Sequence, residues 1–351
     1  MRPWSRLRSA SRLAVAGLAV VAGCGNISVK DAGVHATPSD AAATTEAGGT
    51  PDAADAAAAR RDAADAAPDT PDAAGDSTQA ACDPTAPFAA PMPLADLNTA
   101  ANEDAIFLGD DRLTALFSTD RPGGSGGYDL WVAVRSDLQA PFSAPSPVPG
   151  LNSANDERQP VLSGDSLHLY FMSNHGTSAF RIVEATRNAV TGGFAPPVDV
   201  AGLASGVGDV SPWLSKDGTQ IYFGSGRTGG LGGNDIYVAD LSSAGASNVV
   251  DLTAVDSVDD DASPVLSRDG LTLYFASKRA DPAASGNDDI WIARRSAVGD
   301  PFGPPTPVSE LNSAAADGPR WLSPDGCTLY FTSDRNGGQG GYDLYTATRG
   351  R

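Results

Sequence analysis

The sequence predicts an all-β protein, a five-bladed β-propeller. Three observations support this prediction. Five copies of one motif, spaced by about 52 residues, fill the chain from residue 103 to its last residue. Each copy alternates short apolar runs with turn residues, which is the pattern of consecutive antiparallel strands. The strand that the last copy lacks stands in front of the first copy.

The repeat is clearest in three segments that share the pattern Leu-Ser-x-Asp-Gly followed by an alternating apolar run. These segments are PWLSKDGTQIYFGSGR (212–227), PVLSRDGLTLYFASKR (264–279) and RWLSPDGCTLYFTSDR (320–335). Weaker copies cover residues 107–121 and 161–175. The anchoring phenylalanines are Phe117, Phe171, Phe223, Phe275 and Phe331, at spacings of 54, 52, 52 and 56 residues. A regular period of this length is typical of a propeller.

Four strands are predicted in each copy. The apolar run, the Asp-Gly turn and the next run form a hairpin. A third strand follows a glycine-rich loop and begins at Asp129, Asp235, Asp289 or Asp343. A fourth strand follows Phe142, Phe194 and Phe302, with nearby prolines that suit a sheet edge. Four strands in about 52 residues correspond to one propeller blade.

The last copy ends after its third strand. Its missing fourth strand is predicted at Phe88–Leu94, because FAAPMPL matches FSAPSPV after Phe142 and FGPPTPV after Phe302. We therefore expect the N-terminal strand to complete the last blade and close the ring, which removes exposed sheet edges. The predicted propeller domain covers residues 82–351, with repeats at about 103–153, 154–205, 206–257, 258–313, and 314–351 together with 86–97.

The pattern Leu-Ser-x-Asp-Gly-x-x-Leu-Tyr-Phe-x-Ser-x-Arg, followed by Gly-Gly and Asp-Ile-Tyr, resembles the WD40-like, TolB-type propeller repeats of bacterial envelope proteins (PD40 repeats). The resemblance covers the chain from about Phe88 onward. It implies a propeller with a general binding role and does not imply one particular ligand. The second copy departs from the pattern. It has Asn174-His175 in place of the Ser-x-Arg ending, and its segment Phe180-Arg181-Ile182 lacks the preceding aspartate.

The first 23 residues have the features of an export signal. A basic segment with Arg2, Arg6, Arg8 and Arg12 precedes a short apolar run at residues 13–22. The run ends in Val-Ala-Gly-Cys24, which resembles the lipobox of bacterial lipoproteins. The resemblance implies that residues 1–23 are removed, that Cys24 is acylated, and that Gly25 after it favours the outer membrane. A secretory signal with a chance cysteine is the alternative.

Residues 24–81 are rich in Ala, Asp, Thr and Pro and contain almost no large apolar side chain. Such a composition cannot bury enough surface to offset its ordering entropy, so we expect a disordered tether. The protein is thus predicted to be exported and anchored to a membrane only through lipid. Its propeller would lie in the periplasm or at the cell surface.

The formal net charge of −19 argues against nucleic acid as a partner, because too few cationic side chains are present to neutralise phosphates. Only three histidines occur, and no cluster has the spacing of a metal site. The sequence therefore predicts no cofactor and no metal ligands. The two cysteines besides Cys24 are Cys82 and Cys327, and in an exported protein they predict a disulfide between the N-terminal strand and the last blade.

Acidic residues precede the predicted innermost strands, and arginines stand at the entrances of the glycine-rich loops at the same end of the ring. The candidate binding face comprises Asp104, Asp156, Asp209, Asp260, Asp317, Arg121, Arg227, Arg279 and Arg335. One interpretation is a ligand site at the mouth of the central channel. The other is that each residue stabilises its own blade, which its recurrence favours.

The function expected from these features is that of a monomeric, lipid-anchored binding module for an envelope protein or glycan. The alternative is a five-bladed glycoside hydrolase, which needs two carboxyl groups on either side of one sugar bond. Glu103 and Glu157 are the candidate catalytic pair for that alternative. A catalytic set usually combines different residues that each occur once, and the sequence does not show such a set. Binding is therefore the preferred hypothesis, and no catalytic residue is assigned.

Overall fold

The computed structural model describes residues 82–175, 177–280 and 287–350. The predicted signal peptide, the predicted acylation site at Cys24 and the predicted tether lie outside these residues. Within them, no helix is long and apolar enough to cross a membrane.

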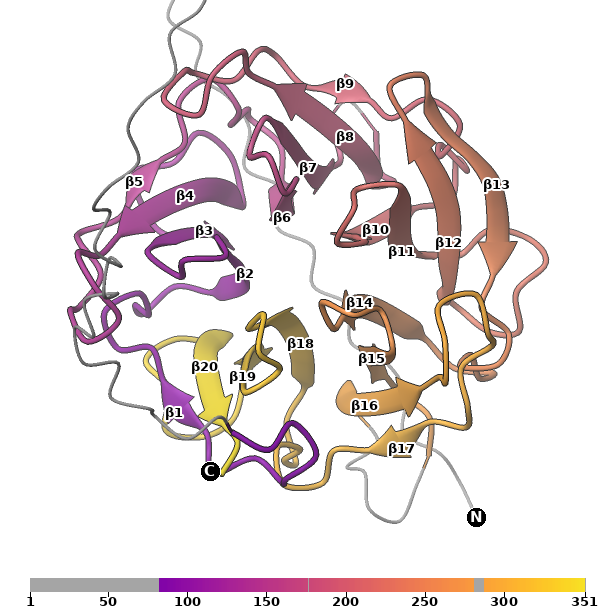
Figure 1. Cartoon of the computed structure of the whole chain (residues 1–351). Coiled ribbons are helices and arrows are strands. Elements are labelled where there is room, and N and C mark those ends of the chain that lie inside the picture. The colour runs from indigo at the N-terminus through magenta and orange to yellow at the C-terminus, as the bar shows by residue number, and fades with distance from the viewer. Residues whose placement is uncertain (1–81, 176, 281–286, 351) are drawn as a thin grey trace, which may run out of the picture. The chain divides into compact units, whose positions relative to one another are not determined.

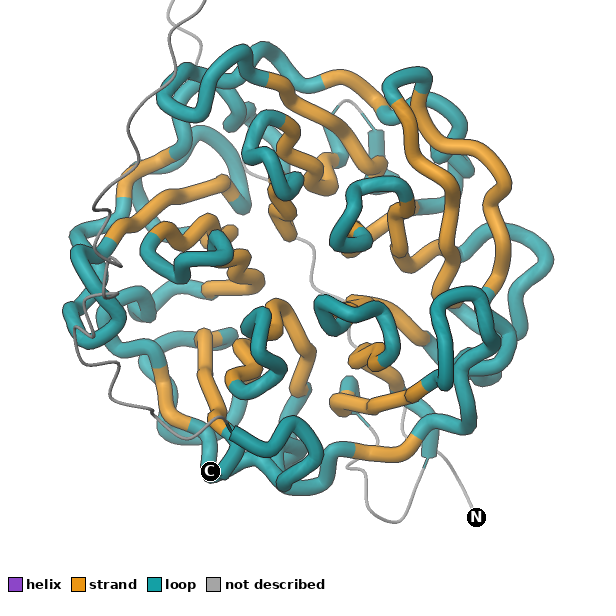
Figure 2. The backbone as a smooth tube through the Cα atoms, in the orientation of Figure 1, coloured by secondary structure: helices purple, strands orange, loops and turns teal. Residues whose placement is uncertain are grey.

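The described residues form five four-stranded antiparallel sheets and no helix (Figures 1 and 2). The first blade comprises β2 (Glu103–Leu108), β3 (Thr114–Thr119), β4 (Asp129–Val134) and β5 (Ser146–Pro147). The second comprises β6 (Glu157–Leu162), β7 (His168–Ser173), β8 (Arg181–Thr186) and β9 (Val198–Asp199). The third comprises β10 (Asp209–Leu214), β11 (Gln220–Ser225), β12 (Asp235–Ser242) and β13 (Gly245–Asp251).

The fourth blade comprises β14 (Asp261–Leu266), β15 (Thr272–Ser277), β16 (Asp289–Arg294) and β17 (Thr306–Pro307). The fifth comprises β18 (Asp317–Leu322), β19 (Thr328–Ser333), β20 (Asp343–Thr348) and the N-terminal β1 (Met92–Pro93). Innermost strands of neighbouring blades contact each other, including β18 and β2, so the ring is closed. The predicted five-bladed propeller is therefore confirmed.

The N-terminal strand completes the last blade as predicted. Met92 pairs with Thr346 and Pro93 with Tyr345, and Phe88 forms an isolated bridge with Arg349. Cys82 and Cys327 are joined by a disulfide with a Cα–Cα distance of 6.0 Å, within the usual range for such bonds. Cys327 directly precedes β19, so the bond links the segment before β1 to the blade that β1 completes.

The Asp-Gly pairs form the hairpin turns between the first and second strands of the last three blades. Gly218, Gly270 and Gly326 adopt φ values of 70°, 70° and 72°, which glycine tolerates without steric cost. Ser166 takes the same conformation in the second blade, with a φ of 61°. The second strand of each blade lies between the first and third strands of its sheet. The anchoring phenylalanine on this strand is 0% exposed in every blade.

The apolar core lies between adjacent blades. One cluster, for example, combines Val265 and Tyr274 of the fourth blade with Leu329 and Phe331 of the fifth. Burying one such side chain contributes about 1.5–3 kcal/mol relative to its exposure. Because each cluster is shared by two blades, the ring is held together by blade-to-blade packing.

A β-bulge interrupts every innermost strand close to its start. In the middle three blades the bulge places a non-glycine residue at positive φ, namely Gln159 at 54°, Ser211 at 55° and Ser263 at 55°. Each of these residues precedes a proline. Bulges re-aim side chains, and here they direct residues of the innermost strands toward the ring centre.

Candidate functional site

Four of the predicted binding-face arginines lie in ion pairs within their own blades. Each contacts the first residue of the innermost strand, whose side chain is at most 1% exposed. The nitrogen–oxygen distances are 3.0 Å for Arg121–Glu103, 2.6 Å for Arg227–Asp209, 2.6 Å for Arg279–Asp261 and 2.5 Å for Arg335–Asp317.

The same arginines also bind the chain that links one blade to the next. Arg227 donates to the carbonyl of Leu203 at 2.9 Å, and Arg335 donates to the carbonyl of Leu311 at 2.6 Å. Their guanidinium groups also lie about 5 Å from two aromatic rings each, as with Arg335 over Phe331 and Tyr345. The structural interpretation of these arginines therefore fits their contacts.

The second blade lacks this arginine, as its sequence departure predicts. His175 stands in its place, with Nε2 3.6 Å from Asp199. The buried Glu157 instead accepts hydrogen bonds from the backbone N–H and hydroxyl of Ser153, at 2.8 and 2.6 Å, and from the hydroxyl of Ser173 at 3.2 Å. Glu103 and Glu157 are therefore both buried and held by hydrogen bonds.

The five predicted binding-face aspartates occupy three different positions. Asp209 and Asp317 begin inner strands and are buried. Asp156 and Asp260 precede inner strands and accept hydrogen bonds from the backbone N–H groups of Tyr128 and Asn234. Of these five aspartates, only Asp104, the second residue of β2, lines a polar cavity at this end of the ring. Asp104 is the second residue of its strand, whereas Asp209 and Asp317 are the first residues of theirs. Because successive strand residues point to opposite faces, this difference of one residue directs Asp104 into the cavity.

A polar cavity of about 330 Å³ lies at the end of the ring where the innermost strands begin. It is lined by residues from all five blades, including Asp104, Arg158, Gln159, Ser211, Ser263, Asp288, Arg320, Thr332 and Tyr342. A volume of this size is at the lower end of the range for small-ligand pockets. It accommodates one large side chain or a group of similar size.

Arg158 and Arg320 share the carboxylate of Asp104. Arg158 Nε lies 3.2 Å from one carboxylate oxygen, and Arg320 Nη2 lies 3.2 Å from the other. Arg320 is also held by Ser263, whose hydroxyl accepts from Nη1 at 2.6 Å, and by Thr332, whose hydroxyl accepts from Nε at 3.0 Å. This network spans the first, second, fourth and fifth blades.

Arg158 is less tightly held than Arg320. Among the described residues its contacts are Asp104 and the ring of Tyr128, whose centroid lies 3.6 Å from the guanidinium carbon. Its side chain is 22% exposed. Besides its contacts with Asp104 and the Tyr128 side chain, the guanidinium group therefore keeps N–H donors for a ligand. Burial raises the pKa of Tyr128 to about 12, so the phenol stays neutral beneath the guanidinium.

A smaller void shares Gln159, Ser211, Ser263 and Arg320 with the lining of the polar cavity. This void of about 30 Å³ lies among the prolines of the bulges, and Trp213 lines both it and a separate hollow at the opposite end of the ring. Trp213 packs against Phe107 with 6.2 Å between ring centroids. Trp213 is therefore shared by the small void and the hollow at the opposite end of the ring.

Three residues at positive φ line this cavity, namely Gln159, Ser211 and Ser263. A non-glycine residue in this region costs about 1–3 kcal/mol, and such strain is concentrated at functional sites. Asp288 also lines the cavity, and burial raises the pKa of its carboxyl group. The cavity therefore combines strained polar side chains, two arginines and carboxyl groups in an arrangement that differs from blade to blade.

Sequence analysis did not single out Arg158, Gln159, Ser211, Ser263 or Arg320. A signal was present in the repeat alignment. Arg320 stands where the three middle blades have proline, and Arg158 stands where the next blades have Val210 and Ala262. Departures from the repeat, and not its recurring charges, mark the residues that line the cavity.

No protein-family model matches this chain, and no curated protein matches it. Solved structures with a similar fold include a protein assigned as TolB from Agrobacterium tumefaciens, 18% identical, with a TM-score of 0.46 over 74% of this chain and 89% of that one. TolB from Acinetobacter baumannii is 14% identical, with a TM-score of 0.44 over 72% of this chain and 56% of that one.

The GH43_1 enzyme from Xanthomonas citri, solved with xylotriose, is also similar to this chain. It is 16% identical, with a TM-score of 0.52 over 75% of this chain and 90% of that one. At these identities the likeness concerns the fold alone. The class that the fold defines is the β-propeller, and this fold by itself does not define a function.

Proposed function

We propose that this chain is a lipid-anchored binding module of the bacterial cell envelope, and that its propeller binds a polypeptide partner at the polar cavity. The observation that carries the proposal is the pair Arg158 and Arg320, which share one carboxylate and line one cavity. Anchoring through Cys24 and display on the segment up to residue 81 remain expectations from the sequence.

The chemistry of the cavity favours a carboxylate on the ligand. Arg158 retains planar N–H donors that match a carboxylate in a bidentate geometry. The cavity of about 330 Å³ fits an acidic side chain or a chain terminus. A neutral sugar would supply no charge opposite the guanidinium, and the Tyr128 ring on which it could stack is covered by Arg158. A protein partner is therefore preferred to a glycan.

The hydrolase alternative receives no support from its candidate pair. Glu103 and Glu157 are 0% and 2% exposed, and their oxygens accept hydrogen bonds from neighbouring groups. The carboxyl groups that do line the cavity are Asp104 and Asp288, and Asp104 is held between two arginines. Glycan hydrolysis by the purified chain, lost in a folded Asp288→Asn variant, would favour this alternative over binding.

The test is capture of a partner from solubilised cell envelope by the intact chain and by an Arg158→Gln variant. The wild-type chain is expected to retain a protein that the variant loses, because a charge-assisted hydrogen bond is worth about 1.5–3 kcal/mol. Arg187→Gln is the matched control. Arg187 also lies over an aromatic ring, 4.6 Å from the Phe194 centroid, but lines no part of the polar cavity. Equal capture by Arg158→Gln would contradict the proposal.

A further inference from the structure

Three junctions between blades use an asparagine in the same way. Asn98, Asn152 and Asn312 each accept a hydrogen bond from a backbone N–H of a third strand through Oδ1, at 2.8 Å in all three cases. The Nδ2 group of each donates back to the carbonyl of that same strand residue, at 2.9, 3.0 and 3.1 Å. The position therefore requires one acceptor and one donor.

The junction between the third and fourth blades has Asp256 at this position. Its Oδ1 accepts from the backbone N–H of Ile236 at 3.0 Å, as the asparagines do. Its Oδ2 replaces the amide donor, and this oxygen is buried without a hydrogen-bond donor. An acceptor thus stands where the other junctions supply a neutral N–H donor, so this junction lacks a hydrogen-bond donor between the Asp256 carboxylate and the strand carbonyl.

Asp251 lies next to Asp256 and has the same deficit. It is the last residue of β13, opposite Tyr237, and both of its carboxylate oxygens are buried without a hydrogen-bond donor. Three of the other blades have proline in this register, at Pro93, Pro147 and Pro307. The combination of two adjacent unsatisfied carboxylates is specific to this junction, and it is separate from the repeat.

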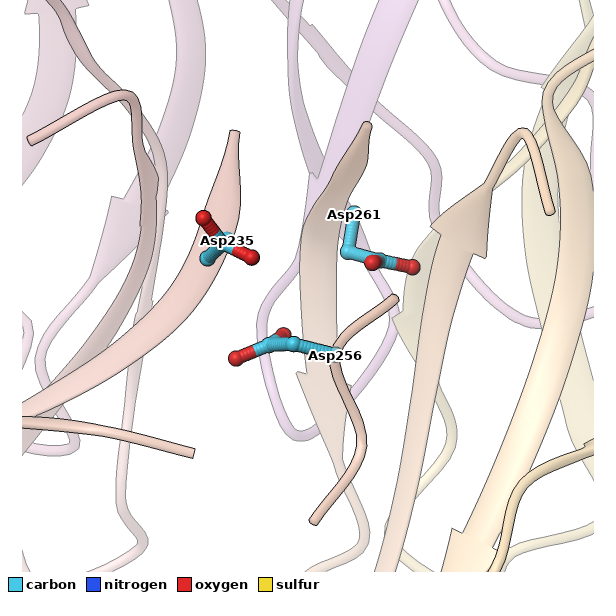
Figure 3. A group of neighbouring side chains, drawn as sticks. All are labelled: Asp235, Asp256 and Asp261. Carbon is cyan, nitrogen blue, oxygen red and sulfur yellow. The ribbon is translucent and has the colours of Figure 1, made fainter. Parts of the chain in front are cut away.

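Two further carboxylates converge on Asp256 (Figure 3). Single oxygens of Asp235, Asp256 and Asp261 lie within 4.8 Å of one another. Asp235 is 1% exposed and Asp261 0% exposed. Asp261 pairs with Arg279 at 2.6 Å through one oxygen and accepts from Ser257 through the other. Asp235 accepts from the backbone N–H groups of Leu231 and Gly232, so the unsatisfied oxygens are those of Asp251 and Asp256. The side chains of Asp251 and Asp256 contact each other, which brings Asp251 to the same cluster.

We propose that Asp235, Asp251, Asp256 and Asp261 form a calcium site between the third and fourth blades. The donors are all carboxylate oxygens, which hard cations prefer. Calcium accepts irregular oxygen geometry more readily than magnesium does. The ion would supply the positive charge that the buried oxygens of Asp251 and Asp256 lack. The site is independent of the polar cavity, so its test does not depend on the proposed binding function.

The test uses the intact chain after removal of divalent cations with EDTA. Calorimetric titration with CaCl₂ is expected to show about one bound ion, with a Kd of roughly 10⁻⁵–10⁻³ M. The melting temperature is expected to rise by roughly 2–6 °C in excess calcium. No heat of binding and equal melting temperatures in EDTA and calcium would overturn the proposal.

Two variants locate the ion. Asp256→Asn restores the donor found at the other junctions, so it is expected to melt higher than wild type in EDTA and to gain nothing from calcium. Asp251→Asn is the second variant and is expected to weaken calcium binding at least tenfold. Retention of the full calcium-dependent rise by Asp256→Asn and Asp251→Asn would overturn the assignment. Asn312→Asp is the control, because it lacks an acidic neighbour at Pro307 and should acquire no calcium dependence.

Discussion

Arg320 of the fifth blade binds Asp104 of the first blade twice. Its Nη2 lies 3.2 Å from the Asp104 carboxylate, and its Nε donates to the Asp104 backbone carbonyl at 2.7 Å. Both residues line the polar cavity, Arg320 from the last blade and Asp104 from the first. Ring closure and assembly of the cavity therefore depend on the same contact, because the cavity is complete only when the fifth blade packs against the first.

Removal of a repeated arginine is expected to destabilise the propeller strongly. Arg335→Met leaves the carboxylate of Asp317, which is 0% exposed, without its cation. The expected loss in the free energy of unfolding is about 3 kcal/mol. Arg268→Met is the control, because its pair with Asp110 is 41% and 66% exposed and should contribute less than about 1 kcal/mol. Chemical denaturation measures both. Equal losses would contradict the structural role of Arg335.

The positive φ of Gln159 at the polar cavity is expected to lower the stability of the fold while placing a side chain that contributes to partner binding. Gln159 adopts a φ of 54°, and Gln159→Gly should raise the free energy of unfolding by about 1 kcal/mol and weaken partner capture. Ser166→Gly relieves the same conformation in a hairpin turn and should stabilise without affecting capture. Unchanged capture by Gln159→Gly would show that this side chain plays no part in binding.

The disulfide is expected to stabilise the closed ring. It joins residues 245 positions apart, so it restricts the unfolded chain strongly. Cys82→Ser or Cys327→Ser should lower the free energy of unfolding by about 2–4 kcal/mol. Reduction of the wild-type protein should give the same loss, and reduction should not affect either variant. A denaturation midpoint that is unchanged after reduction would contradict this role.

Replacing a junction asparagine (Asn98, Asn152 or Asn312) by aspartate is expected to destabilise the propeller, because the carboxylate cannot donate the hydrogen bond that the amide makes. Asn98→Asp removes the donor to the carbonyl of Leu344 at a position that is 5% exposed. The expected loss is about 1–3 kcal/mol, the cost of an unsatisfied buried polar group. Asn188→Asp, at an exposed site, should be neutral. Thermal denaturation that does not distinguish the two variants would contradict the account of the junctions.

The propeller was predictable because its determinants are local and repeated. Asp-Gly turns, anchoring phenylalanines and period-2 apolar runs recur in each copy, and the match of Phe88–Leu94 to later segments predicted which strand closes the ring. The recurrence of Arg227, Arg335, Asp209 and Asp317 favoured a structural interpretation over a binding role in the sequence, and the ion pairs that these residues form within their own blades fit that interpretation.

The cavity was not predictable from the repeat because it depends on where single residues point. Whether an inner-strand side chain faces the ring centre or the blade interior is decided by the bulge, which shifts the register by one residue. Arg158 and Arg320 also meet Asp104 across blade boundaries, a proximity that no spacing within one copy encodes. Asp251 and Asp256 are likewise brought together by β13, which in this blade alone is seven residues long.

The most direct test of the binding account is site-specific photo-crosslinking in cells that produce the chain. A photoreactive residue at Ser263 lies in the polar cavity, and one at Lys216 lies at the opposite end of the ring. The account predicts a discrete protein adduct from position 263 that disappears with Arg158→Gln, and none from position 216. An adduct from position 216 alone, or one from position 263 that persists in Arg158→Gln, would contradict it.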